Sequence, residues 1–460
     1  MKIFNTLTHQ LEQLELPRDR AVRMYTCGPT VYDTAHIGNL RSYILADVLV
    51  RALRFTGYEV NWVMNITDID DKTIKRTIET YGVGATVENL RNLTEDIFET
   101  FLNDLDQVGV DRNRIEFVRV TDVIAEIQDF ILELIESGYA YKADDGSTYF
   151  SIAKYQDQFG DYGQLVGDKF LEGKQLGIRI KNDEYEKENL ADFVLWKAHD
   201  VEDAQIFWEH PRLGRGRPGW HIECSVVNSV AFDAQMTDIH TGGIDLVFPH
   251  HTNEIAQTTP LYNPFTHYWV HTEHLLIDGK KMAKSAGNFY TLRDIEAKGF
   301  SGRDLRYAIL STKYNVTQNF TWEALSAAHS AIDKIDRFLE SGSMGPDVCQ
   351  EYRQQFEVII ENDLNTPQTL ALIFDVIGSD RSLEKKICTI ATFDQVLSLG
   401  FINKIGKTEA VPEMVTNLLA QRDAARLVRN FEEADALRIK LDTLGYEIMD
   451  TPEGSKVRKK

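Results

Sequence analysis

The feature that most constrains the fold is an alternation of strand-like and helix-like patterns early in the chain. Residues 21–26 and 59–65 are short, largely apolar runs, and residues 38–55 carry apolar side chains at helical spacing before Gly57. A strand, a helix and a second strand within so few residues form a βαβ unit, whose crossover helix makes the two strands parallel. The sequence therefore predicts a parallel sheet with a ligand crevice at the carboxyl ends of its strands.

The strand and helix pattern changes twice further along the chain. Polar loops surround short strands over about 113–203, and helical spacing dominates after about residue 304, with helices expected over 325–339, 352–362 and 369–377. Near the end, a helix over 430–444 precedes a turn at 450–454 between two short strands. We therefore predict an α/β protein: a Rossmann-type parallel-sheet domain with an inserted α+β connective domain, followed by an all-α bundle and a small C-terminal α/β-hairpin module. The predicted boundaries are 1–112 and 204–270 for the two sheet halves, 113–203 for the insertion, 271–325 for a region with a lysine-rich loop, 326–405 for the bundle and 406–460 for the C-terminal module.

Composition narrows the classes of protein that remain. The chain has 460 residues, four cysteines and a net charge of -21, which argues against a disulfide framework and against non-specific binding of polyanions. No apolar run is long enough to cross a bilayer, and the first residues lack the apolar core of a signal peptide. We therefore expect a cytoplasmic protein with no membrane partner. The basic end, formed by Lys456, Arg458, Lys459 and Lys460, is expected to be a frayed tail.

Two short segments have the composition of a phosphate site. The first segment, residues 27–39, ends at the start of the predicted helix. The first turn of that helix, next to His36, Gly38 and Asn39, offers unpaired N–H groups and a partial positive charge. Lys281 and Lys284 lie three residues apart in a loop of small residues, which suits a clamp on a triphosphate. Each segment alone also fits a simpler structure, an incidental histidine at a helix start or a solvated basic loop.

Four further residues have the chemistry of a metal site. Cys27, Cys224, His250 and Glu254 offer two thiolates, an imidazole and a carboxylate, a set that suits zinc. His250 and Glu254 are four residues apart and share a face if they lie on a helix. Because Cys27 and Cys224 are far apart in the chain, spacing alone leaves open that each is a small buried apolar residue.

Taken together, these segments resemble the paired signatures of class I aminoacyl-tRNA synthetases, HIGH and KMSKS. Here they read HIGN at 36–39 and KMAKS at 281–285. Further motifs resemble the cysteinyl-tRNA synthetase family, in order and spacing, from residue 1 to about 300. They are Cys-Gly-x-Thr at 27–30, Asn-Ile-Thr-Asp-Ile-Asp-Asp-Lys at 65–72, Asp-Phe-Val-Leu-Trp-Lys at 192–197, Gly-Trp-His-Ile-Glu-Cys at 219–224 and Phe-Pro-His-His-x-Asn-Glu at 248–254. Thr252 departs from the family, which usually has Glu there.

The resemblance implies an activity and a set of roles. It implies ATP-dependent activation of L-cysteine and its transfer to tRNA(Cys), by a monomer with one Zn²⁺ per chain and Mg²⁺ bound with ATP. The implied zinc ligands are Cys27, Cys224, His250 and Glu254. The implied catalytic residues are His36, Asn39, Lys281 and Lys284; the ATP and adenylate contacts are Gly38, Gly243, Asp245 and Lys284; and the cysteine pocket contains Gly28, Thr30, Thr67 and Trp220. Zinc would separate cysteine from serine, because a hydrophobic pocket cannot strongly reject a hydroxyl isostere and thiolate is the better zinc ligand.

Other residues and other functions stay open at this stage. We expect His221, His240, His251 and His274 to be structural, and Asp70 with Asp71 to cap a helix. The bundle resembles the family's anticodon-binding module, so a chain cut near residue 330 should still activate cysteine but charge less tRNA. One alternative is an ATP-dependent cysteine ligase that acts on a small amine, and another is a non-catalytic RNA-binding paralogue, which the intact signature lysines and ligands disfavour.

Overall fold

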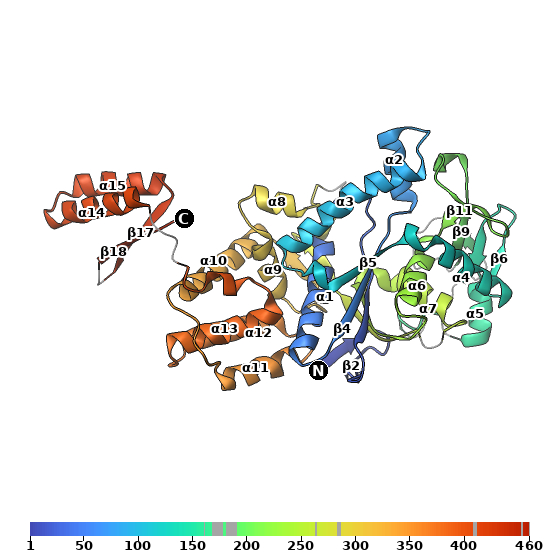
Figure 1. Ribbon diagram of the computed structural model, residues 1–460, viewed down its shortest axis with the longest axis horizontal. Coiled ribbons are helices and arrows are strands. Elements are labelled where there is room, and N and C mark those ends of the chain that lie inside the picture. Colours follow the sequence, from blue (N-terminus) through green and yellow to red (C-terminus); the bar gives the residue numbers. More distant parts are fainter. Residues whose placement is uncertain are drawn as a thin grey trace. The chain divides into compact units, whose positions relative to one another are not determined.

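A computed structural model describes residues 1–160, 162–167, 178–180, 191–262, 265–282, 287–407, 412–451 and 454–459 (Figure 1). The chain forms two compact units, Met1–Ile405 and Gly406–Lys460. Within the described residues, no helix combines the length and apolar character needed to cross a membrane.

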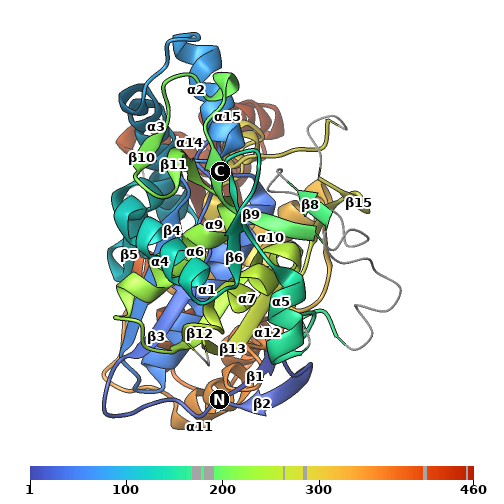
Figure 2. The ribbon, with the colours of Figure 1, turned by 90° about the vertical axis from the view of Figure 1, so that its right-hand side faces the viewer.

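The centre of the first unit is a five-stranded sheet in which all neighbouring strands are parallel (Figure 2). Its order is β13-β12-β3-β4-β5. The strands are β3 (Val22–Thr26), β4 (Val60–Ile66), β5 (Ile115–Arg119), β12 (Thr237–Gly243) and β13 (Thr266–Thr272). After β3 the chain adds β4 and β5 on one side and later returns to add β12 and β13 on the other. The sheet therefore has a topological switch between β3 and β12, where ligands bind in open α/β sheets.

Helices cover both faces of this sheet. Alternate strand residues point to opposite faces, so Met24 and Trp62 join one buried cluster while Tyr25 and Val63 join another. The helix α1 (Ile37–Phe55) packs on the first face, and α6 (Trp220–Ala231) packs on the second. The predicted α/β class with a parallel sheet is therefore confirmed.

A second sheet and several helices complete this part of the unit. The second sheet has the order β10-β11-β9-β7-β6, with β8 paired to β9. Its strands are β6 (Ala140–Lys142), β7 (Thr148–Phe150), β8 (Ile178–Ile180), β9 (Ala191–Ala198), β10 (Trp208–His210) and β11 (Gly214–Pro218). The other helices of this part of the chain are α2 (Asp71–Tyr81), α3 (Val87–Gln107), α4 (Ile124–Glu136), α5 (Ile152–Phe159) and α7 (Thr252–Thr258). Although β5 falls within the range predicted for the insertion, it is the edge strand of the parallel sheet. Asp70 caps α2 as expected, accepting a hydrogen bond from the Thr73 N–H at 2.7 Å.

Two small sheets and a further group of helices complete the first unit. One small sheet joins β14 (Leu275–Ile277), β15 (Lys280–Lys281) and β16 (Gln318–Phe320), and the other joins β1 (Lys2–Asn5) and β2 (Gln10–Gln13). The helices are α8 (Leu292–Ala297), α9 (Gly302–Leu310), α10 (Trp322–Glu340), α11 (Gln350–Ile360), α12 (Thr366–Gly378) and α13 (Leu383–Leu397). These helices share one buried cluster with α1, and the rings of Phe55 and Phe356 meet at 5.5 Å.

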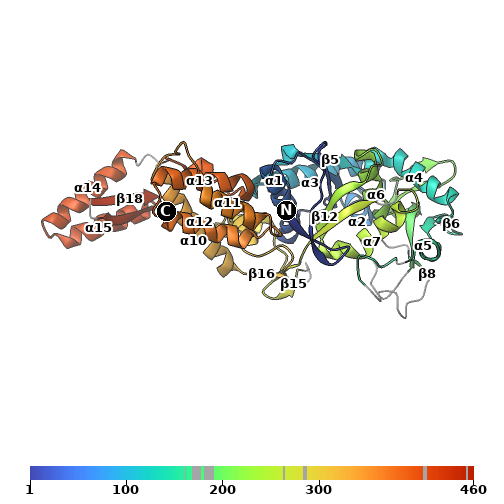
Figure 3. The same cartoon turned by 90° about the horizontal axis from the view of Figure 1, so that it is seen from below.

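The second unit is a helix pair with a β-hairpin. The helices α14 (Glu413–Leu427) and α15 (Phe431–Thr443) run side by side, and the strands β17 (Tyr446–Thr451) and β18 (Gly454–Lys459) pair antiparallel against them (Figure 3). The expectation of a frayed basic tail is wrong for Lys456, Arg458 and Lys459, because these residues form β18. Lys460 lies outside the described residues.

Candidate active site and metal centre

The first helical turn of α1 is organised by its own side chains. The Asn39 N–H donates to His36 Nδ1 at 3.1 Å, and the His36 N–H donates to Asn39 Oδ1 at 3.2 Å, which makes a reciprocal cap. Because His36 Nδ1 accepts a hydrogen bond, the neutral ring carries its proton on Nε2. The Ile37 N–H is also bonded, to Tyr290 O at 2.9 Å. What the helix start offers an anion is therefore its partial positive charge, an imidazole donor and an exposed amide.

The segment after β3 lies against the end of β4. The Gly28 N–H donates to Asn65 Oδ1 at 2.8 Å, and a side chain at Gly28 would place its Cβ only 1.7 Å from the Asn65 carbonyl oxygen. Thr30 and Thr67 form an isolated parallel bridge. This close contact between two chain segments fixes the backbone of residues 28–31 at the carboxyl end of the sheet.

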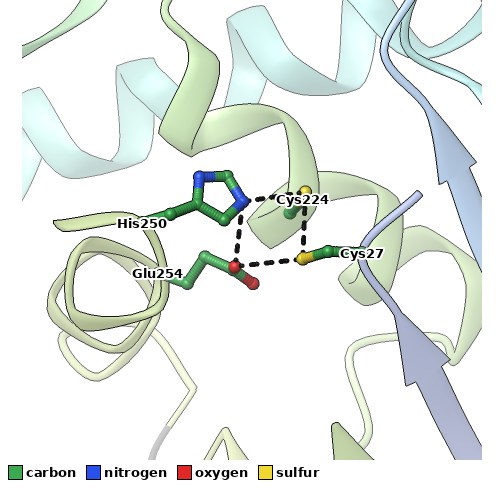
Figure 4. Close-up of side chains that lie close together, drawn as sticks. All are labelled: Cys27, Cys224, His250 and Glu254. Atoms are coloured by element: carbon green, nitrogen blue, oxygen red, sulfur yellow. Dashed lines mark hydrogen bonds and ion pairs between the residues drawn. The ribbon is translucent and has the colours of Figure 1, made fainter. Parts of the chain in front are cut away.

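Four side chains from separate parts of the sequence meet beside this segment (Figure 4). Cys27 follows β3, Cys224 lies in α6, His250 lies in the short turn η5 (Val247–His251), and Glu254 lies in α7. Cys27 Sγ lies 3.7 Å from Cys224 Sγ and 3.7 Å from Glu254 Oε1. His250 Nε2 lies 3.2 Å from Cys224 Sγ and 3.2 Å from Glu254 Oε1. One ligand atom of each residue therefore lies within 4.8 Å of the other three, as a shared metal ion requires.

Burial makes the charged forms of these side chains costly. Cys27 is 6% exposed, and Cys224, His250 and Glu254 are each at most 1% exposed. Loss of water raises the pKa of both thiols and of the Glu254 carboxyl, and it lowers the pKa of the His250 imidazole. Without a cation the neutral forms are therefore favoured, and a bound divalent cation reverses that preference for the three acids. The donor set thus fits a borderline-soft metal ion.

The ligand set borders a cavity of about 490 Å³ at the switch between β3 and β12. Most residues predicted for the site line this cavity, namely Cys27, Gly28, Thr30, His36, Gly38, Asn39, Trp220, Gly243, Asp245 and Lys281. Cys27 belongs to both the ligand set and the cavity wall. Trp220 also connects them, because its ring stacks on His250 at a centroid distance of 4.4 Å. A molecule in this cavity would meet the Cys27 sulfur and the start of α1 together.

Comparison with known proteins shows which family shares this arrangement. The family model described as tRNA synthetases class I (C) catalytic domain matches residues 13–330. A cysteine–tRNA ligase from Chlamydia muridarum is 40% identical and aligns over 99% of each chain. Another from Brachyspira hyodysenteriae is 38% identical, again over 99% of each chain. The chain belongs to the cysteine–tRNA ligase family. The resemblance inferred from the motifs is thereby confirmed.

Solved structures of more distant proteins share the fold of this cysteine–tRNA ligase family member. Mycobacterium tuberculosis methionyl-tRNA synthetase bound by methionyl-adenylate is 12% identical, with a TM-score of 0.57 over 84% of this chain and 92% of that chain. A leucyl-tRNA synthetase in a ternary complex from Agrobacterium radiobacter is also 12% identical, with a TM-score of 0.58 over 85% of each chain. At this identity the likeness concerns the architecture alone.

Thr67, which was predicted for the cysteine pocket, lies behind the cavity wall. Thr67 is 1% exposed and donates its hydroxyl to Glu223 Oε2 at 3.1 Å, so it supports the Thr30 segment from beneath. Lys284 lies outside the described residues. The other signature lysine, Lys281, lies at the end of β15, and its carbonyl accepts from Asn288 Nδ2 at 3.0 Å.

Histidines around the ligand set are more closely involved than the sequence indicated. His251 Nε2 lies 3.3 Å from Cys27 Sγ, and His240 Nε2 lies 3.0 Å from Glu254 Oε2. With Cys27 and Glu254 they form a second group of potential ligands. His251 Nδ1 in turn lies 2.7 Å from His271 Nε2. Buried partners of this kind orient the ligands of metal sites in proteins.

The loop after β13 was missed as part of the cavity wall. Glu273 and His274 both line the cavity, although the sequence analysis assigned no role to Glu273 and only a structural one to His274. The signal that could have found them is their place shortly after the apolar run 268–270, since the ends of parallel strands gather at one edge.

Proposed function

We propose that this protein activates L-cysteine with ATP to form cysteinyl-adenylate and then transfers the cysteinyl group to the 3′-terminal ribose of tRNA(Cys). The position of Cys27 carries this proposal, because Cys27 belongs both to the buried ligand set and to the wall of the cavity of about 490 Å³. An amino acid whose side chain reaches the ligand set would have its carboxylate in the same cavity as the start of α1. Membership of the cysteine–tRNA ligase family over almost the full length supports the same activity.

The ligand set is proposed to hold one Zn²⁺ per chain. Tetrahedral zinc holds sulfur at about 2.3 Å and nitrogen or oxygen at about 2.0–2.2 Å, so its ligand atoms lie roughly 3.3–3.8 Å from one another. The separations of 3.7, 3.7, 3.2 and 3.2 Å here are close to those values. When bound, zinc supplies a soft Lewis acid that takes a thiolate in preference to an alcohol, and so separates cysteine from serine.

The other wall of the cavity is proposed to hold the triphosphate, with Mg²⁺ bound to ATP. The side chains of His36 and Asn39 at the positive end of α1 suit an anion, and Lys281 lines the same cavity. In the first step the cysteine carboxylate attacks the α-phosphate in line and pyrophosphate leaves. Positioning and charge stabilisation account for most of such catalysis. Lys281 and Lys284 are proposed to neutralise the departing pyrophosphate.

Residues between these walls are proposed to hold the middle of the adenylate. A Cβ at Gly243 would lie 2.4 Å from Asp245 Oδ1, so the absence of a side chain lets that carboxylate pack against the backbone at the cavity wall. Gly28, Thr30 and Trp220 border the space next to the ligand set and are proposed to surround the substrate cysteine. Thr67 is proposed to act through the backbone of Thr30.

The helices α10 to α13 and the second unit are proposed to contact tRNA(Cys). We further propose that the enzyme is monomeric and cytoplasmic. The alternative product, a cysteinyl amide of a small amine, requires the same first step and differs only in the acceptor.

Pyrophosphate exchange tests the first step directly. Purified protein should catalyse cysteine-dependent ATP–pyrophosphate exchange, and serine should support it more than about 200-fold less well, because a hydrophobic pocket without a metal gives only about 10–200-fold discrimination. Charging of tRNA(Cys) with labelled cysteine tests the second step. Exchange without charging would favour the small-amine ligase, and absence of cysteine-dependent exchange would contradict the proposed function.

A further inference from the structure

Arg41 is a buried arginine whose guanidinium donates to main-chain oxygens. It lies in α1, two residues after Asn39, and is 1% exposed. Other buried arginines among the described residues have a carboxylate partner, as Arg306 has in Asp47. The guanidinium of Arg41 instead donates to five carbonyls of two separate loops. Nη1 donates to Glu273 O at 2.6 Å and His274 O at 2.8 Å, and Nη2 donates to Lys313 O at 3.2 Å, Tyr314 O at 3.4 Å and Val316 O at 2.7 Å.

The two loops that Arg41 joins support the strand that carries Lys281. Glu273 and His274 connect β13 to β14, and residues 313–316 lead into β16. β14 pairs with β16 on one side and with β15 on the other, where Leu276 lies opposite Lys281. The loops are also bonded to each other, since the Glu273 N–H donates to Tyr314 O at 2.8 Å. One guanidinium therefore attaches the base of this small sheet to α1.

This attachment spans the proposed nucleotide site. His36, Gly38 and Asn39 at the start of α1 line one part of the cavity, and Lys281 with Glu273 lines another. The backbone of Arg41 belongs to α1, and its guanidinium is bonded to the main chain of the loops on the Lys281 side of the cavity. A change in the length or shape of this side chain would therefore change the distance between the start of α1 and Lys281.

The side chain is suited to this position by its charge and its geometry. Burial lowers the pKa of Arg41 to about 10, and the nearby Glu273 carboxylate opposes the shift, so the group remains charged at neutral pH. Five carbonyl dipoles then compensate the buried charge. The planar fork of arginine directs donors to both loops at once, whereas lysine presents a compact charge with only three donors.

We propose that Arg41 is a positioning residue that fixes the distance between the start of α1 and the Lys281 strand, so that both can act on one nucleotide. The role rests on the proposed function, because it concerns the transfer of the α-phosphate in that cavity. Arg41 touches no reacting atom in this proposal, and its effect passes through the backbone of two loops.

Arg41→Lys and Arg41→Met should change the rate of adenylate formation more than they change substrate binding. Misplacement by about 1 Å can lower a rate by about 100-fold. We expect kcat of pyrophosphate exchange to fall about 10-fold in Arg41→Lys and about 100-fold in Arg41→Met. KM for cysteine and the zinc content should stay within about twofold of wild type, because the guanidinium makes no contact with the ligand set. Arg54→Lys, near the far end of the same helix, should behave as wild type.

A second measurement keeps the inference separate from the proposed function. Amide hydrogen exchange of the folded full chain should speed up in both Arg41 variants within peptides covering 273–281 and 313–320, and should stay unchanged around Cys224 and His250. If amide hydrogen exchange in those loops is unchanged in the Arg41 variants, the inference is overturned, whether or not the wild-type protein is active. Wild-type kcat in Arg41→Lys would also overturn it, as would an equal loss of zinc and of cysteine binding. If the wild-type protein shows no pyrophosphate exchange but amide exchange in the two loops is faster in the Arg41 variants, only the proposed function is contradicted.

Discussion

At the scale of single residues, neighbouring donor atoms distinguish a proposed metal ligand from an ordinary buried thiol. Cys224 and Cys349 are both buried, at 1% and 5% exposure. Cys224 Sγ lies 3.2 Å from His250 Nε2 and 3.7 Å from Cys27 Sγ. Cys349 precedes α11 and donates its N–H to Thr389 Oγ1 at 3.0 Å, and in the described part of the chain it belongs to no group of potential metal ligands.

This contrast gives a matched pair of variants. Cys224→Ser should reduce zinc from about one per chain to a small fraction and lower cysteine-dependent exchange on the order of 100-fold or more, because a hydroxyl is a poor zinc ligand. Metal analysis of the purified variant measures the first effect and pyrophosphate exchange the second. Cys349→Ser loses a thiol of similar burial and should keep both zinc and activity. Full zinc in Cys224→Ser would refute the ligand set.

A second residue links stability to pH. Asp104 in α3 is 4% exposed, and burial raises its pKa to about 6, with Glu296 adding to the shift and Arg293 opposing it. In the unfolded chain this carboxyl has a pKa near 3.9, below its value in the folded protein. Ionisation of Asp104 therefore lowers the free energy of unfolding as pH rises from about 4 to about 6, and the protein stays destabilised by the full amount above pH 6. Asp104→Asn should therefore stabilise the protein by about 1–2 kcal/mol at pH 7.5, after allowance for solvent screening, and by almost nothing at pH 4. Denaturant unfolding at both pH values measures this, and an equal gain at both would contradict the assignment.

The residues that could be predicted from the sequence are those whose identity and local spacing carry the chemistry. Cys27 and His36 lie in motifs, and the structure brings them to one cavity. The contact of His251 with His271 could not be foreseen, because sequence separation does not reveal that α7 begins beside β13. Arg41 gave no signal, since a lone arginine in an amphipathic helix usually faces solvent.

At the scale of elements, prediction succeeded where a periodic pattern had clear ends. The helix expected over 38–55 is α1, Ile37–Phe55, and the expected strands at 21–26 and 59–65 are β3 and β4. The helix α13 was not predicted, because Thr389 and Thr392 interrupt its apolar pattern. The strand β18 follows the turn predicted at 450–454, but its basic end was expected to fray, because its basic residues hide the alternation that pairs Val457 with Ile448.

Elements of the first unit are joined by a buried ion pair whose loss should be severe. Asp47 of α1 accepts from Arg306 of α9 at 2.6 Å, both side chains are at most 1% exposed, and Arg306 also donates to Leu397 O at the end of α13. Asp47→Asn leaves a buried guanidinium without its counter-charge and should lower the free energy of unfolding by about 3–5 kcal/mol. The exposed pair of Glu351 and Arg381 is the control, and Glu351→Gln should cost less than about 1 kcal/mol. The midpoint of chemical denaturation measures both, and equal costs would show that burial does not set the contribution of these pairs.

At the scale of the whole molecule, the bundle helices belong to the body of the first unit. One buried cluster includes Leu49 and Leu53 of α1 together with Phe356 of α11 and Phe393 of α13. The compact unit accordingly extends to Ile405. A cut near residue 330, which the helical pattern suggested as a way to separate activation from charging, would pass through this core.

Two truncations should therefore behave differently. A chain of residues 1–330 loses α11 to α13 and exposes the apolar side chains that they cover. Each buried leucine or phenylalanine contributes about 1.5–3 kcal/mol, so the loss of several such contributions exceeds the free energy of unfolding of about 5–15 kcal/mol that is typical of a protein.

A chain of residues 1–405 lacks only the second unit, which has its own core of Val415, Leu418, Leu419 and Leu441. It should fold, keep pyrophosphate exchange within about threefold of the full chain, and charge tRNA(Cys) at least about 10-fold more slowly, because charging alone requires the tRNA contacts proposed for that unit. Circular dichroism, exchange and charging distinguish these outcomes: a folded, active 1–330 chain would place the bundle outside the catalytic body, and full charging by 1–405 would mean that the second unit does not read the tRNA.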